Sequence, residues 1–231
     1  MRNQVLFEDN HLIIVNKIAG DIVQADVYDD KTLRDEVKDY IKEKYDKPGN
    51  VYLGVVHRID RPVTGAVIFA RTSKALARLN DMFRKRNLQK IYWAVVDQQP
   101  PKDEDYLVNY LRKDITKNKS FITSETNPDA VRAELSYKLM AASDRYFLLQ
   151  VELFTGRHHQ IRTQLASIGC RIKGDLKYGF PRSNPDASIH LHARSLKFMH
   201  PVSKEEVTIV APTPDEPLWN FFQGLMSKKP S

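Results

Sequence analysis

Short runs of apolar and β-branched residues recur along the chain, each bounded by residues that favour turns. The first two, at 5–8 and 12–16, flank Asp9-Asn10 and predict a β-hairpin. Because such strands follow one another closely in sequence, we expect a largely antiparallel sheet. The alternation in one later run changes phase between Ala193 and Leu196, which predicts a β-bulge. The later runs span residues 66–70, 90–96, 131–140, 146–154, 189–198 and 207–210.

A few segments between these strands have helical periodicity instead. Thr32 and Ser73 each precede apolar residues at helical spacing and are expected to cap helices. A third helix is expected after the turn at 155–157, with Gly169 at its end, and a fourth at 218–226 over one edge of the sheet. The charged stretch that ends at Asp105 predicts a surface connection.

The 231 residues contain no repeat of fixed period and no Gly/Ser-rich linker. We therefore expect a single α+β domain over residues 1–231, in which a central mixed, largely antiparallel sheet is flanked by helices and loops. No apolar run reaches the roughly 18 residues that a membrane span needs, and no signal peptide is recognisable, so we expect a cytoplasmic protein. The single cysteine, Cys170, excludes an internal disulfide and a structural zinc site.

Positive charge is concentrated in two stretches of the chain, which has a net charge of +7. Residues 71–90 hold 7 basic side chains against Asp81 alone, and residues 156–182 hold 6 against Asp175 alone. Two such concentrations are typical of a groove that binds a polyanion such as nucleic acid. The alternative is that both are ordinary solvated faces of helices.

One nine-residue segment, 57–65, places Asp60 between Arg58 and Arg61 just before a glycine and a buried strand. Neighbouring guanidinium groups favour the ionised carboxylate, so Asp60 is expected to stay an anion and to serve as nucleophile or base. The alternative is a structural ion pair in a loop. Spacing alone does not decide between the two.

This segment, His57-Arg58-Ile59-Asp60-Arg61-Pro62-Val63-Thr64-Gly65, resembles the signature His-Arg-Leu-Asp-Arg-x-Thr-Ser-Gly of the RluA family of RNA pseudouridine synthases. The resemblance runs from about residue 5 to residue 211, so residues 212–231 form a C-terminal extension. Departures from the pattern are Ile59, Val63-Thr64 and Ile18, and none removes a group that the chemistry needs. Further blocks match in the family's order: Glu8-Asp9, Asn16-Lys17 through Gly20, 90–96, 155–162, Gly174-Asp175, Tyr178-Gly179, 191–194 and His200-Pro201.

The resemblance implies a pseudouridine synthase catalytic domain with a basic cleft over Asp60, which would attack the target uridine. Tyr92 matches the tyrosine that stacks on the base, and Arg157 the arginine that pairs with the catalytic aspartate. Arg58 matches the residue that fills the space left by the flipped base. The alternatives are a core tyrosine for Tyr92, a phosphate contact for Arg157 and a surface ion pair for Arg58. The reaction is an isomerisation, so no cofactor is implied.

Extruding a base costs a few kcal/mol, which phosphate contacts must offset. The implied partner is an RNA stem-loop in tRNA or rRNA, and no membrane or obligate protein partner is expected. The family's frequent extra amino-terminal RNA-binding domain has no counterpart here, so recognition is expected from the catalytic domain. The residues expected to bind RNA are Arg58 and Arg61 together with candidate backbone contacts at Lys74, Arg78, Arg84, Lys85, Arg86, Arg162, Arg171 and Lys173.

Two other functions remain open at this stage. A catalytically silent RNA-binding protein could share the scaffold, although the joint presence of Asp60, Tyr92 and Arg157 counts against it. A metal-dependent RNA hydrolase could use His158-His159 and His190-x-His192. No carboxylate or thiol accompanies these histidines at a recognised ligand spacing, so no metal is expected.

Overall fold

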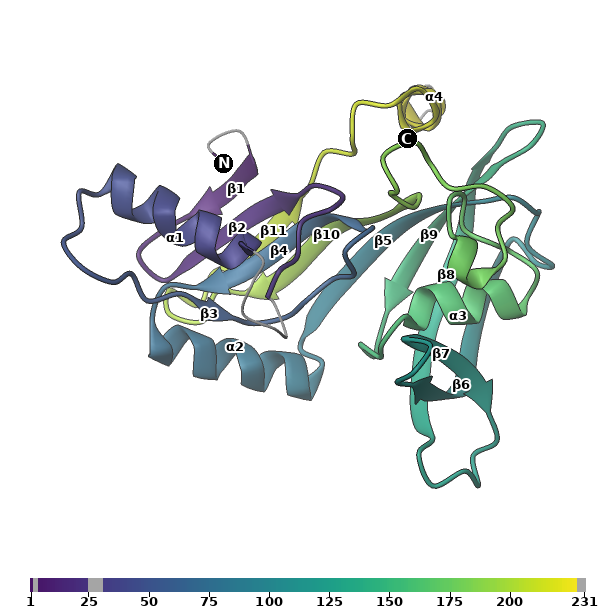
Figure 1. Ribbon diagram of the computed structural model, residues 1–231, viewed down its shortest axis with the longest axis horizontal. Helices are drawn as coiled ribbons and strands as arrows, with labels where there is room; N and C mark the ends of the chain where they lie inside the picture. Colours follow the sequence, from purple (N-terminus) through teal and green to yellow (C-terminus); the bar gives the residue numbers. More distant parts are fainter. Residues whose placement is uncertain (2–3, 25–30, 228–231) are drawn as a thin grey trace. The chain divides into compact units, whose positions relative to one another are not determined.

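The computed structural model describes residues 1, 4–24 and 31–227 (Figure 1). The chain divides into two compact units. The first unit comprises Met1–Gln89 and Ala193–Pro212, and the second comprises Lys90–His192 and Thr213–Ser231. Each unit contains its own sheet segment and helices, and each is described separately below.

The first unit is built on a sheet with the strand order β1-β2-β4-β10, to which β3 adds on β4 and β11 on β10. The predicted hairpin is confirmed, since β1 and β2 pair antiparallel around Asp9-Asn10. In β10 the pairing with β11 is regular from Ser195 to Met199, so this part of the strand carries no bulge. The strands are β1 (Val5–Glu8), β2 (Leu12–Lys17), β3 (Gly54–Val55), β4 (Thr64–Ala70), β10 (Leu191–Met199, from Ala193 in this unit) and β11 (Glu206–Val210).

Helices α1 (Leu33–Lys44) and α2 (Ser73–Lys85) cover opposite faces of this sheet (Figure 1). Successive residues of a strand point to opposite faces, so β2 and β4 must be apolar throughout to bury both. Ile13 of β2 packs in the core under α1, whereas the adjacent Ile14 packs in the core with α2. This explains why residues 12–15 and 66–70 are continuously apolar rather than alternating.

The amino terminus of α1 is capped by Thr32 as predicted, and that of α2 is capped one residue earlier than predicted. The hydroxyl of Thr72, not that of Ser73, accepts a hydrogen bond from the backbone N–H of Ala75 at 3.1 Å. Ser73 is instead the first residue of the helix. Both residue types cap well, so only the backbone geometry distinguishes them.

The second unit has a sheet with the strand order β5-β9-β8-β6-β7, in which every neighbouring pair is antiparallel. The hairpin of β6 and β7 was not predicted. Strand β6 begins at Glu104, inside the stretch expected to be a surface connection. The strands are β5 (Leu88–Val96, from Lys90 in this unit), β6 (Glu104–Asp114), β7 (Lys119–Thr123), β8 (Val131–Ala142) and β9 (Phe147–Leu153).

The helical elements of the second unit are α3 (Gln160–Ser167), the 3₁₀ turn η2 (Leu176–Tyr178) and α4 (Pro217–Ser227). Helix α4 was expected to cover an edge, but it covers a face. Its Trp219 and Phe222 pack into one core cluster with Trp93 of β5 and Leu148 of β9. The C-terminal extension, as far as Ser227, is therefore part of the core of this unit.

Candidate active site

Asp60 lies on the loop that joins β3 to β4 in the first unit. Its side chain is half-buried, while Arg58 and Arg61 on either side are exposed. The backbone turns here, with the N–H of Val63 donating to the carbonyl of Asp60 at 3.0 Å. The loop thus carries Asp60 between two exposed arginines in the chain, and Nε of Arg61 donates to the carbonyl of Gly20 at 3.1 Å.

The ammonium group of Lys17 holds this loop from inside the first unit. It donates hydrogen bonds to the carbonyl oxygens of Ile18, Arg61 and Val63 at 2.9, 2.9 and 2.7 Å. Only 1% of Lys17 is exposed, and burial lowers its pKa to about 8. The group therefore stays charged at neutral pH, and each of its three protons can bond one of these carbonyls, two of which belong to the Asp60 loop.

The family resemblance includes Lys17 but implies no function for its side chain. The sequence does indicate that Lys17 is buried, because it ends a strand that begins with four apolar residues. A buried lysine must find hydrogen-bond partners inside the unit.

Gly65 fixes the point where the loop enters the sheet. It pairs with Lys17 across β2 and β4, and its backbone has a φ of +115°. A Cβ at this position would lie 2.4 Å from the carbonyl oxygen of Ala193, closer than any real contact allows. Only glycine fits both the backbone conformation and the approach of β10.

Tyr92 lies on β5 in the second unit, opposite Val151 of β9. Its side chain is 8% exposed, and both faces of the strand are buried from Tyr92 to Val96. The ring shares its face of the strand with the small Ala94, as the alternation predicts.

Arg157 lies on the turn between β9 and α3, also in the second unit. The turn is held by Gln160, whose side-chain oxygen accepts from the N–H of Arg157 at 3.1 Å and from the hydroxyl of Thr155 at 2.7 Å. The guanidinium Nε donates to the carbonyl of Arg132 at 3.0 Å, and the residue is exposed. The sequence motif around Arg157 thus builds a rigid turn with an accessible cation.

His158 and His159 follow on this turn, with their rings stacked 3.8 Å apart between centroids. Both ring nitrogens of His158 are engaged, by Ser120 and Asn118, and Nδ1 of His159 lies 3.0 Å from the hydroxyl of Tyr178. Burial, together with the charge of Arg162, lowers the pKa of His159 to about 2. Within residues 1, 4–24 and 31–227, no group of three or more potential ligands is arranged to hold a metal ion.

The structure corrects the role expected for Arg162. Its side chain is 5% exposed and forms two hydrogen bonds, of 2.7 and 2.8 Å, with the buried carboxylate of Asp175. A guanidinium that is enclosed and paired in this way is not available to a phosphate, so Arg162 has a structural role.

Arg171 and Lys173 also have partners within the second unit. Arg171 pairs with Asp97 at 2.7 Å, although 40% of its side chain stays exposed. Lys173 donates to the side-chain oxygen of Asn184 at 2.8 Å. These contacts weaken the case for either residue as a phosphate contact.

The basic residues of the first unit are more accessible. Arg78 donates to the carbonyl of Pro201 at 2.9 Å and is partly buried. Arg84 and Lys85 both pair with Asp81 on the same helix, which reduces the positive charge they can offer. The exposed candidates on and just after α2 are Lys74, Arg84, Lys85 and Arg86.

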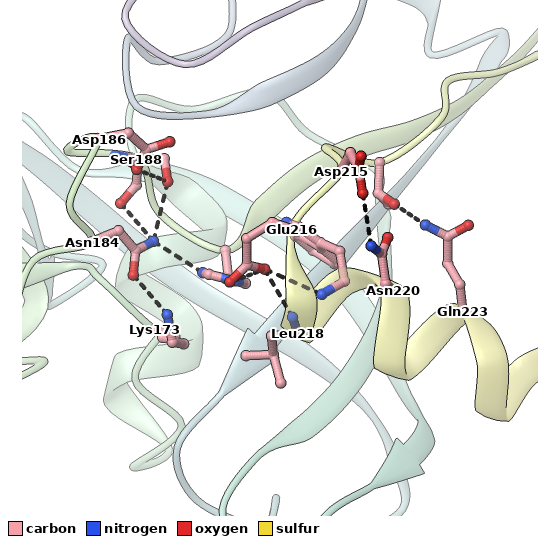
Figure 2. A network of polar contacts seen from close by, with 12 residues as sticks. Lys173, Asn184, Asp186, Ser188, Asp215, Glu216, Leu218, Asn220 and Gln223 are labelled. Atoms are coloured by element: carbon pink, nitrogen blue, oxygen red, sulfur yellow. Dashed lines mark hydrogen bonds and ion pairs between the residues drawn. The ribbon is translucent and has the colours of Figure 1, made fainter.

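His190 belongs to a polar network in the second unit that also excludes it as a metal ligand (Figure 2). Lys173 can only donate, so the oxygen of Asn184 faces it and the amide nitrogen faces Nδ1 of His190 at 3.0 Å. The imidazole then carries its proton on Nε2, which lies 3.0 Å from the carboxylate of Glu216. Glu216 in turn accepts from the backbone N–H groups of Leu218 and Trp219 at the start of α4.

Comparison with known proteins identifies the family. The profile of a family described as RNA pseudouridylate synthase matches residues 11–167. The chain is 32% identical over 224 residues to the ribosomal large subunit pseudouridine synthase D of Zymomonas mobilis subsp. mobilis, covering 92% of this chain and 70% of that protein. It is 30% identical over 232 residues to the tRNA pseudouridine synthase C of Pectobacterium carotovorum subsp. carotovorum, covering 90% of this chain and 58% of that protein.

A solved structure, of human RNA pseudouridylate synthase domain containing 4, has the same fold. It matches with a TM-score of 0.80 at 21% identity, covering 100% of this chain and 95% of that one. The expected α+β fold with a mixed, largely antiparallel sheet is therefore confirmed.

The chain belongs to the family of RNA pseudouridylate synthases. These enzymes are isomerases that modify RNA, so the predicted family, class of activity and RNA substrate are confirmed. In the part of the chain that the structure describes, no helix is long and apolar enough to cross a membrane.

Proposed function

We propose that this protein converts a specific uridine of a structured RNA to pseudouridine, with Asp60 as the catalytic carboxylate. The observation that carries the proposal is the loop at Asp60. Lys17 donates hydrogen bonds to two carbonyls of this loop, those of Arg61 and Val63, and Arg58 and Arg61 flank Asp60 in the sequence. A nucleophile needs a fixed position, and these hydrogen bonds hold the backbone next to Asp60.

In this reaction the bond between C1′ of the ribose and N1 of the uracil breaks, and the base turns. C1′ then bonds to C5, C5 gives up its proton, and N1 takes up a proton in place of its bond to C1′. The atoms of the nucleotide are rearranged without net oxidation, so the reaction needs no electron donor or acceptor. We assign Tyr92 to stacking on the base, Arg157 to stabilising the carboxylate of Asp60, and Arg58 to occupying the space left by the extruded base.

We further propose that the substrate is a stem-loop of ribosomal RNA or tRNA and that the protein acts in the cytoplasm. Relatives named for each RNA are about equally similar to this chain, at 32% and 30% identity. We propose that RNA is bound by the exposed residues that flank Asp60 and by those on or just after α2: Arg58, Arg61, Lys74, Arg84, Lys85 and Arg86.

The test is tritium release from RNA labelled at C5 of uridine, with bulk tRNA and bulk ribosomal RNA assayed separately in the presence of EDTA. Loss of the C5 proton accompanies pseudouridine formation, so wild-type protein should release tritium from one pool, and EDTA should not prevent it. RNA binding without release from either pool would instead support the silent RNA-binding protein. Release that EDTA abolishes would contradict a metal-independent mechanism.

A further inference from the structure

The tip of the β6–β7 hairpin in the second unit exposes an apolar side chain among lysines. Ile115 is 84% exposed, and Lys113 and Lys117 beside it are also exposed. We propose that this tip is a second RNA-binding surface, which grips the phosphate backbone of the substrate while Ile115 packs against its sugars or bases. This inference rests on the proposed function, because it takes the partner to be the substrate RNA.

The tip is held rigidly, although it projects from the sheet. The side chain of Asp114 accepts from the N–H of Lys117 at 3.0 Å, and the carbonyl of Ile115 accepts from the N–H of Asn118 at 3.2 Å. Asn118 is held from two further sides, by Nε2 of His158 at 3.1 Å and by the ammonium of Lys177 at 3.0 Å. A preorganised tip loses little conformational entropy when it binds.

The charge of the tip fits a polyanion. Residues 112–119 carry four basic side chains and one acidic side chain, a net charge of +3. The acidic one, Asp114, is engaged with the backbone of Lys117. Among the described residues, no carboxylate forms an ion pair with the ammonium groups of Lys113, Lys117 or Lys119. Unneutralised ammonium groups of this kind suit phosphate oxygens.

Aromatic rings accompany these lysines. The ammonium groups of Lys117 and Lys119 lie 5.8 and 5.2 Å from the ring centroid of Phe121, and that of Lys119 lies 4.7 Å from the centroid of Tyr178. Cation–π contacts orient the lysine side chains while leaving the ammonium protons available to a phosphate.

The hairpin is joined to the turn that carries Arg157. Asn118 at the tip contacts His158, the residue after Arg157, and Ser120 donates its hydroxyl proton to the carbonyl of His158 at 2.7 Å. An RNA that reaches Arg157 could therefore extend along the hairpin of the same unit. A rigid apolar side chain between phosphate-binding cations is typical of proteins that open a stacked helix, which favours RNA over a protein partner.

The experiment compares the double variant Lys113→Gln/Lys117→Gln with a matched control, Lys42→Gln/Lys47→Gln at the end of α1. The control removes the same charge from exposed lysines. The ammonium group of Lys47 lies 6.0 Å from the centroid of the Tyr45 ring, close to the 5.8 Å between the ammonium group of Lys117 and the centroid of Phe121. Filter binding to bulk tRNA and bulk ribosomal RNA over a range of salt concentrations gives affinity and its salt dependence.

The hairpin variant should bind roughly tenfold more weakly than the control, and its slope of log affinity against log salt should fall by about 1.5, because each lost phosphate contact removes about 0.7 to 0.9. Ile115→Ser should weaken binding several-fold with an unchanged slope. Equal affinities and slopes in the hairpin and control variants would overturn the proposal. Tritium release by the wild type is measured separately, so a failure of the proposed activity and a failure of the hairpin surface give different results.

Discussion

The ammonium group of Lys17 shows how a single buried side chain can position the loop that carries Asp60. A lysine that is 1% exposed and has its pKa lowered to about 8 costs stability, because its charge has left water. The hydrogen bonds to the carbonyls of Ile18, Arg61 and Val63 offset that cost. Two of these hydrogen bonds fix the backbone just after Asp60, at Arg61 and Val63.

Lys17→Met tests this role. The substitution leaves three backbone carbonyls, two of them in the Asp60 loop, without their donor, so the free energy of unfolding should fall by about 2 kcal/mol. The loop should also become mobile, and kcat for tritium release should fall with little change in KM. Denaturant unfolding and steady-state kinetics measure the two effects. A variant with wild-type kcat would show that the loop does not depend on Lys17.

Arg162 illustrates where sequence reasoning fails for single residues. Its charge and its place in a basic stretch resemble those of an RNA contact, but charge does not reveal burial. Asp175, the one acidic residue in that stretch, is its partner. Asp60, in contrast, could be singled out from the sequence because its motif resembles that of a family.

Arg162→Met should destabilise the fold without changing the electrostatics of RNA binding. Removing one member of a buried ion pair typically costs about 3–5 kcal/mol, because the carboxylate of Asp175 stays buried without its partner. Denaturant unfolding should show this loss, while the salt dependence of RNA affinity in the folded variant should match the wild type. If the slope of log affinity against log salt falls by about 1 in the variant, Arg162 does contact a phosphate.

Helix α4 is anchored to the second unit both by apolar packing and by a polar network. Trp219 and Phe222 fill the core against β5, and Glu216 links the start of the helix to His190 (Figure 2). The hydrogen bond from His190 lowers the pKa of Glu216 to about 2, so this carboxylate stays ionised over the range in which proteins are normally studied.

Acid should destabilise the protein through its buried histidines. Burial lowers the pKa of His190 below its ordinary value of 6.5, and that of His159 to about 2. Below about pH 6.5 the unfolded chain therefore binds protons that the folded chain does not, and stability falls as pH decreases. Thermal unfolding at about pH 7.5 and about pH 5.5 should show a lower midpoint in acid.

His190→Gln provides the comparison, because glutamine does not titrate and its amide can still donate to Glu216. The variant should be less stable than the wild type at neutral pH but lose less of its stability in acid. An acid dependence identical to that of the wild type would contradict a buried neutral His190.

Strands and helices with a clear pattern of apolar residues can be predicted from the sequence, whereas the other elements cannot. Strands such as β2 and β4, buried on both faces, are continuous apolar runs, and α1 has both periodicity and a cap, so each was found. Strands β6 and β7 expose many charged side chains and fold because β8 pairs with β6 and β6 pairs with β7, a tertiary effect that local patterns do not report. The overlooked hairpin is the one that carries the proposed second RNA surface.

At the scale of the whole molecule, the order of motifs along the chain was more informative than any local property. Charge indicated a polyanion partner, and spacing left the role of Asp60 open. The ordered blocks from residue 5 to residue 211 indicated the family, which the match over residues 11–167 confirms. Relatives named for tRNA and for ribosomal RNA are about equally similar to this chain, so the choice between these RNAs requires measurement.

The most direct test of the account is single-turnover tritium release from C5-labelled RNA by wild-type protein and by Asp60→Asn, with RNA affinity measured for both. The substitution keeps the size of the side chain and removes its negative charge. We predict that the variant folds and binds RNA with nearly wild-type affinity but releases no tritium above background. Release at the wild-type rate by Asp60→Asn would contradict the central claim that this carboxylate performs the chemistry.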